Sequence, residues 1–268
     1  MIKINDALLR LPAHTVITTK FLKEFGISRQ LLNKYIKSKW FEHIAKGAVK
    51  RYGDKLSLHG AIYALQQQLS LPVHIGARSS LELQGLAHNI RIGNSTQVFL
   101  FKTEASTQLP SWFKTNFGKN VIFKNSSARI AQCHSSTIAN VLLNFNCGDY
   151  TIKISSLELA IIESCYLVPA YQSFEECYNI VAGLVALRPH IMQDLLIHCD
   201  SIRAKRLFLF MAFKAGLPLV KYLDLNKIDL GTGKIQVVAN GIFDPKFMIT
   251  VPHIFKGNNG TNNSESLF

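Results

Sequence analysis

The chain has 268 residues, 48% of them hydrophobic, and a net charge of +13. It is long enough to bury the core of one large or two small domains, and this composition excludes wholesale disorder. The start of the chain lacks the apolar core of a signal peptide, and the uncharged stretches 56–77 and 130–148 are interrupted by polar residues. We therefore expect a soluble, cytoplasmic protein without a membrane partner.

Positive charge is concentrated at the N-terminal end of the chain. Residues 1–60 contain 12 Lys and Arg against 4 Asp and Glu, whereas residues 151–268 contain 11 against 10. A basic excess confined to one small module is typical of a surface that binds phosphates.

The sequence of this module predicts a helix-turn-helix. After a first helix over 4–11, a second helix is expected over 18–25 with a Thr cap, and Gly26 permits the left-handed conformation that ends a helix. Ser28 is a strong cap for a third helix reaching residue 39, whose leucines form one stripe while Arg29, Asn33 and Lys37 share the opposite one. Such an arrangement places the last helix in the major groove of duplex DNA.

A β-hairpin is expected to follow over 40–52, with its turn at Lys46-Gly47, and would act as a wing beside the DNA backbone. On the third helix, side chains near its start suit base edges, whereas Lys34 and Lys37 suit phosphates. The predicted DNA-binding residues are Thr19, Ser28, Arg29, Gln30, Asn33, Lys34, Lys37, Lys46, Lys50 and Arg51. The alternative is a helical hairpin that only packs and whose charges are solvated, but the confined charge, the caps and the basic hairpin together favour DNA.

The rest of the chain alternates between helical and extended patterns. Helices are predicted over 58–71 and 79–87, and strands over 73–76, 97–102 and 121–124. Ser155 and Glu158 have the spacing of a capping box before an apolar helix. Helices are also expected over 174–187, 190–199 and 202–216, then a hairpin of 234–238 and 247–251 with its turn near residues 240–241, and a disordered tail over 256–268.

No catalytic, cofactor or metal site is predicted. The segment from Gly231 to Lys234 resembles part of a phosphate loop but lacks the remaining required residues. Glu158 and Glu163 lie five positions apart on a helix and face different ways, and His74 on an apolar strand is more often a core histidine than a base. The chain is therefore expected not to be an enzyme.

The cysteines suggest reduced, mostly buried thiols, because their number is odd and no pair has Cys-x-x-Cys spacing. His190, His198 and Cys199 could suggest zinc, but tetrahedral sites usually draw ligands as close pairs from two places. Structural side chains are the favoured interpretation.

One further basic cluster, at Arg203, Lys205 and Arg206, enters an aromatic helix. Two interpretations stay open: a solvated helix start, which is somewhat favoured, or a contact surface for an acidic partner.

Several stretches in order resemble the AbiEi family of antitoxins from abortive-infection systems. They include Gly26–Leu32 with the Lys46-Gly47 turn, Leu71–Gly85, Ser155–Ala160 and Ile249–Pro252. The resemblance implies an α+β chain: a winged helix-turn-helix over 1–56 and a larger mixed α/β antitoxin domain over 57–255.

The resemblance also implies function. Members repress their own operon by binding promoter repeats in double-stranded operator DNA, and they counter a nucleotidyltransferase-like toxin, directly or functionally, in phage defence. Two alternatives remain: a stand-alone transcriptional regulator whose larger domain senses a ligand, and a DNA-acting enzyme, for which the sequence offers no carboxylate-rich metal site.

Overall fold

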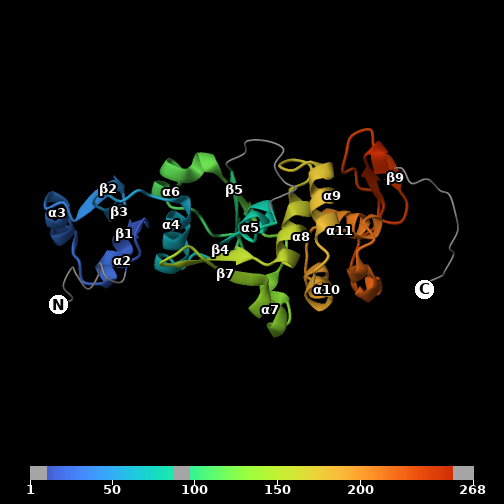
Figure 1. Ribbon diagram of the computed structural model, residues 1–268, viewed down its shortest axis with the longest axis horizontal. Helices are drawn as coiled ribbons and strands as arrows, with labels where there is room; N and C mark the ends of the chain where they lie inside the picture. Colours follow the sequence, from blue (N-terminus) through green and yellow to red (C-terminus); the bar gives the residue numbers. More distant parts are fainter. Residues whose placement is uncertain (1–10, 87–96, 256–268) are drawn as a thin grey trace.

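The computed structural model describes residues 11–86 and 97–255 as an elongated molecule with its N-terminal elements at one end and its C-terminal elements at the other (Figure 1). The predicted helix over 4–11, apart from the buried Leu11, and the predicted disordered tail lie outside these residues, as does the end of the helix predicted over 79–87. Within the described ranges, no helix has both the length and the apolarity needed to cross a bilayer.

In the N-terminal unit, the two helices expected after residue 17 and the hairpin are present, and a short strand that was not predicted precedes them. Strand β1 (Ile17–Thr18) leads into α2 (Thr19–Glu24) and α3 (Arg29–Lys37), followed by the hairpin β2 (Phe41–Ala45) and β3 (Ala48–Arg51), which pairs with β1. Thr18 and Ser28 cap the two helices through Oγ atoms that each accept a backbone N–H at 3.2 Å. Gly26 has a φ of +76°, as a helix end of this kind requires.

Leu22, Leu32, Phe41 and Val49 give this unit a small core of its own. A buried glutamine helps to join the unit to the rest of the chain, together with a hydrogen bond from the Ser57 N–H to the His14 carbonyl and the packing of Val16 and Ala48 in the neighbouring core. Gln68 lies in the π-helix η1 (Ala64–Gln68) that continues α4 (Leu58–Tyr63), where one longer helix was predicted. Its amide donates to the Val16 carbonyl and accepts from the Thr18 N–H, both at 2.7 Å. Because both groups are buried, these bonds hold β1 against the following helix.

A five-stranded mixed sheet forms the centre of the molecule, in the order β6-β5-β4-β8-β7. The strands are β4 (Val73–Ile75), β5 (Val98–Lys102), β6 (Val121–Asn125), β7 (Leu142–Asn146) and β8 (Thr151–Ser155). The first three were predicted, but the β7–β8 hairpin was not. Between the strands lie α5 (Ala77–Leu83), α6 (Ser111–Phe117), η3 (Gly118–Asn120), η4 (Ile130–Gln132) and α7 (Ser135–Val141).

Four helices follow the sheet and carry the largest apolar core of the described residues. They are α8 (Leu157–Leu167), α9 (Phe174–Gly183), α10 (Pro189–Ile197) and α11 (Ile202–Lys214). Short turns η5 (Pro218–Tyr222), η6 (Leu225–Lys227) and η7 (His253–Phe255), with the strands β9 (Ile242–Asp244) and β10 (Ile249–Val251), complete the fold.

The predicted C-terminal hairpin was placed wrongly. Its first strand is β9, which begins after residues 240–241, because the Asp244 carboxylate accepts the Phe247 N–H at 2.8 Å and closes the turn there. Residues 234–238 form no strand; Ile235 makes only an isolated parallel bridge to Ile249.

The predicted capping box was also wrong by one residue. Strand β8 continues through Ser155, so Ser156 is the residue that caps α8. Glu158 instead binds Arg188, with its Oε2 2.7 Å from the guanidinium. Burial by itself would raise the pKa of Glu158, but the hydrogen bonds from Arg188 outweigh burial and the pKa is lowered.

A second buried carboxylate connects α8 to the sheet. Glu163 accepts hydrogen bonds from Ser155 Oγ at 2.7 Å and from the Ala77 N–H at 3.0 Å, and its Oε1 lies 2.7 Å from His74 Nε2. His74 is fully buried, as expected for a core histidine. Gly76 belongs to the same cluster, because a Cβ there would lie 2.1 Å from Glu163 Oε2.

Candidate functional site

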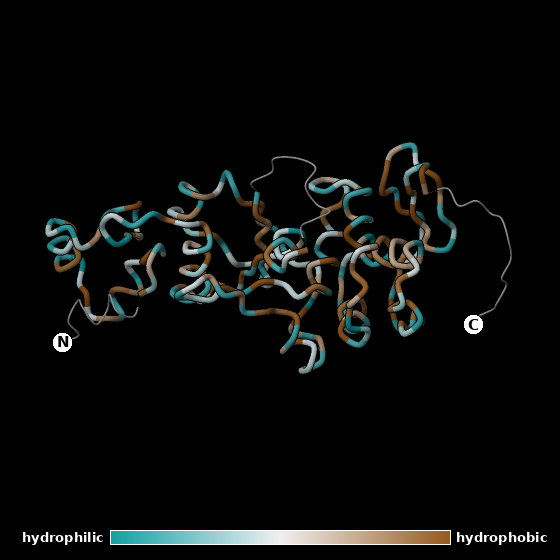
Figure 2. The backbone as a smooth tube through the Cα atoms, viewed as in Figure 1, coloured by the Kyte–Doolittle hydropathy of each residue, from teal (hydrophilic) through white to brown (hydrophobic). Residues whose placement is uncertain are grey.

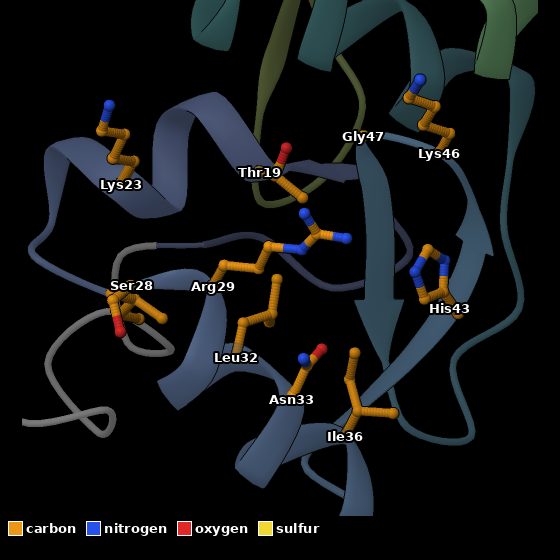
Figure 3. A pocket seen from close by; sticks show the side chains of 11 residues that line it. Thr19, Lys23, Ser28, Arg29, Leu32, Asn33, Ile36, His43, Lys46 and Gly47 are labelled. Atoms are coloured by element: carbon orange, nitrogen blue, oxygen red, sulfur yellow. The ribbon is translucent and has the colours of Figure 1, made fainter.

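A groove of about 630 Å³ opens between α3 and the β2–β3 hairpin. Figure 3 shows α2, α3 and the hairpin surrounding it, with the Arg29 side chain reaching across the space between them. The groove is lined by Thr19, Lys23, Ile27, Ser28, Arg29, Leu32, Asn33, Ile36, His43, Lys46 and Gly47.

The cap of α3 decides which side chains face this groove. Because the Ser28 hydroxyl starts the helix, Arg29 is its first residue and Asn33 follows one turn later on the same side. Both side chains are exposed and point toward the groove in Figure 3, whereas Leu32 is buried in the core beneath. Arg29 and Asn33 therefore present a guanidinium and an amide from neighbouring turns of a fixed helix.

The other predicted residues of α3 enlarge this polar face. Gln30, Lys34 and Lys37 are all exposed, and Figure 2 shows α3 as a predominantly hydrophilic helix. Across the described residues, neither Lys34 nor Lys37 makes an ion pair with a carboxylate. Their charges are therefore available to an anionic partner.

Of the three cations predicted on the hairpin, one lies at the groove and two bind other groups of the domain. Lys46 is exposed at the turn, where Gly47 has a φ of +89° and its carbonyl accepts the Thr19 N–H at 3.0 Å. Lys50 instead lies 3.1 Å from Glu42 and donates to the Asp54 carbonyl. Arg51 donates to the Leu11 carbonyl. The structure thus uses these last two side chains to hold the domain together.

Two polar lining residues were not anticipated, Lys23 at the end of α2 and His43 on β2. Lys23 belongs to the basic N-terminal stretch and lies in the last turn of α2, so its sequence position could have indicated a place beside the turn between the two helices. Nothing in the local sequence marks His43, since only the packing of β2 beside α3 brings it to the groove.

The basic cluster in the second half is not an open surface. Lys205 and Arg206 are each only 2% exposed. Arg206 donates to the carbonyls of Leu230, Gly231, Gly233 and Met248 at 2.6 to 3.2 Å. Arg203 is half-buried and donates to the Tyr166 carbonyl at 3.0 Å. Lys205 and Arg206 are thus buried, and protein carbonyls take the place of solvent around the Arg206 guanidinium. For these two residues, both interpretations are wrong: they form neither a solvated helix start nor a contact surface for a partner.

Two family models match the chain. The first, described as "Transcriptional regulator, AbiEi antitoxin N-terminal domain", matches residues 1–92. The second, described as "Transcriptional regulator, AbiEi antitoxin, Type IV TA system", matches residues 95–252. Curated proteins gave no match.

Among solved structures, the crystal structure of the RV2827C protein from Mycobacterium tuberculosis is similar. It has a TM-score of 0.54 at 12% sequence identity and covers 92% of this chain and 88% of that chain. At this identity the likeness concerns the fold alone.

Proposed function

The chain belongs to the AbiEi family of antitoxin transcriptional regulators, and we propose that it binds operator DNA to repress its own operon. In this proposal α2 and α3 act as a helix-turn-helix, the β2–β3 hairpin acts as its wing, and the rest of the chain neutralises a nucleotidyltransferase-like toxin.

One observation carries the DNA half of the proposal. The capped helix α3 presents Arg29 and Asn33 toward an open groove beside a basic hairpin turn. An α-helix fits the major groove of B-DNA, and the first residues of such a helix contact base edges. Arg29 suits guanine, Asn33 and Gln30 suit adenine, and Lys34, Lys37 and Lys46 suit phosphates.

Thr19 and Ser28 have supporting roles in this proposal. Each begins a helix at the groove, and the hydroxyl of Ser28 is already used as a cap. In this proposal Lys50 and Arg51 do not contact phosphates directly. Their bonds within the domain instead hold in place the hairpin that bears Lys46.

A mobility-shift titration with the DNA upstream of its own gene tests the DNA half. Arg29→Ala and Asn33→Ala should weaken binding to the operator by about 1 to 3 kcal/mol each and relax base preference at one position. Lys37→Ala should weaken binding to all sequences and reduce the dependence of log K on log salt by about 1. Lys119→Ala, an exposed lysine after α6, is the matched control. Parent-like binding by all three groove variants would refute the assignment.

The second half of the proposal expects a gene for a nucleotidyltransferase-like toxin beside this one, and co-expression with that toxin tests it. The parent chain should restore growth, and a full-length Arg29→Ala/Asn33→Ala variant should restore it equally while failing to bind the operator. No rescue by the parent chain would favour a stand-alone regulator that senses a ligand.

A further inference from the structure

Four side chains that can bind metal meet where the segment before α7 packs against α10. Cys133 and His134 are consecutive residues, and Asp194 and His198 are four positions apart, on α10 and at its C-cap. The two pairs are 60 positions apart in the sequence, and the fold brings them together. Ligands drawn as close pairs from two places are typical of structural zinc sites.

The inner three ligand atoms are already close. Cys133 Sγ, an Asp194 carboxylate oxygen and a His198 ring nitrogen all lie within 4.8 Å of one another. His134 Nδ1 lies 3.0 Å from Asp194 Oδ1, and His198 Nδ1 lies 3.1 Å from the same oxygen. Tetrahedral zinc with bonds of about 2.0 to 2.3 Å needs ligand atoms about 3.3 to 3.8 Å apart, which the three inner atoms approach, whereas the exposed His134 lies outside that group and would turn toward it.

The Asp194 carboxylate provides an independent indication of a ligand. Asp194 is 4% exposed, and its Oδ2 accepts the His134 N–H at 2.8 Å. Its Oδ1 is buried and receives no hydrogen bond of good geometry, although the Nδ1 atoms of His134 and His198 lie 3.0 and 3.1 Å from it. A buried carboxylate oxygen without a well-formed hydrogen bond, beside a thiol and two imidazoles, is a position that a cation would stabilise.

We propose that Cys133, Asp194 and His198 bind a zinc ion, with His134 as the fourth ligand. Sulfur, imidazole nitrogen and one carboxylate oxygen form a donor set that suits zinc rather than magnesium or calcium. Binding releases the Cys133 thiol proton to solvent, so the ligands contribute a thiolate and a carboxylate that balance the 2+ charge.

Bringing these ligands onto zinc changes a few existing contacts. His198 Nδ1 gives up its 3.0 Å contact with the Asp194 carbonyl, and Cys133 Sγ gives up a weak 3.8 Å bond to the Arg129 carbonyl. The Arg129 guanidinium is nearby but is paired with Asp200 at 2.9 Å.

The proposed role is structural. With four protein ligands the ion keeps no open position for a substrate, as in structural zinc sites generally. The ion joins the segment that leads from the central sheet into α7 to the C-terminal end of α10. Zinc therefore fixes the sheet against the helices of the second half of the chain.

Cobalt(II) substitution of the full-length protein tests the site, since tetrahedral thiolate-bound cobalt gives visible ligand-field bands and an ultraviolet charge-transfer band. The parent chain, first treated with a chelator and then dialysed, should bind one cobalt and lose it to one equivalent of zinc. Cys133→Ser should abolish the charge-transfer band and weaken zinc binding by about 100-fold or more, and His134→Ala by about 10-fold or more. Cys147→Ser and His190→Ala, which replace a cysteine and an exposed histidine outside the cluster, should leave both spectra and affinity unchanged.

Thermal unfolding gives a second readout. Free zinc at about 100 times its Kd should raise the unfolding midpoint of the parent chain by about 5 to 10 °C, and not that of Cys133→Ser. If Cys133→Ser does not fold, His134→Ala decides the matter, because that side chain is 79% exposed. The proposal is overturned if the parent chain shows no charge-transfer band, or if His134→Ala matches it in both affinity and midpoint shift.

Discussion

Replacing Arg206 by methionine separates a structural role from a partner-binding role. Methionine keeps an apolar stem of similar length but removes all the guanidinium donors, which reach four carbonyl groups around residues 230–248. A hydrogen bond from a charged donor contributes about 1.5 to 3 kcal/mol, so a simple sum would be far too large. Gly231 and Gly233 are exposed and their carbonyls can turn to water. We therefore expect a loss of about 3 kcal/mol in the free energy of unfolding.

Urea unfolding followed by circular dichroism measures this loss. Arg203→Met is the matched control, because it removes one bond from a half-buried side chain to one carbonyl and should cost about 1.5 kcal/mol, the lower end of that range. At a temperature where Arg206→Met is folded, it should bind operator DNA and rescue growth like the parent. A variant as stable as the parent to within about 0.5 kcal/mol that fails to rescue growth would refute this reasoning and return Arg206 to a partner surface.

Three further predictions concern buried groups. Gly76→Ala should destabilise the protein by about 3 kcal/mol, measured by thermal unfolding, because its Cβ would lie 2.1 Å from Glu163 Oε2; an unchanged melting point would contradict the packing described around that carboxylate. Glu158→Gln should cost about 2 kcal/mol at neutral pH, because it removes the charge of a buried carboxylate that accepts hydrogen bonds from the partly exposed Arg188. Because the pKa of Glu158 is lowered in the folded state, this stabilisation is present above the ordinary pKa of the carboxyl and is lost as the pH falls through the lowered pKa. Urea titrations from neutral to acidic pH should therefore show the stabilities of the parent and the variant converging. A stability difference that stays constant with pH would count against the pair. Gln68→Ala should raise amide hydrogen exchange in β1 without changing that of β5, and uniform exchange would argue against its joining role.

The N-terminal unit was predictable from the sequence because its signals are local. A cap, a left-handed glycine and a hairpin turn act within about five residues, and charge can be counted along the chain. Helix periodicity then placed Arg29, Asn33 and Lys37 on one face, and the structure leaves all three exposed. The family resemblance was confirmed over both halves of the chain.

Tertiary structure alone decided which polar side chains are buried and what they meet. Lys50, Arg51 and Arg206 looked like surface cations, yet each is bound within the protein by groups distant in sequence or across a turn. The adjacent serines at 155 and 156 are equally good helix caps in the sequence. Only the point at which β8 ends, after Ser155, makes Ser156 the cap of α8.

The cluster of Cys133, Asp194 and His198 shows the same limit most clearly. Each residue by itself is ordinary, and sequence spacing pointed away from a metal. Periodicity reports the environment of a residue along its own helix or strand, whereas a ligand set depends on the distance between elements, which only the packed core determines.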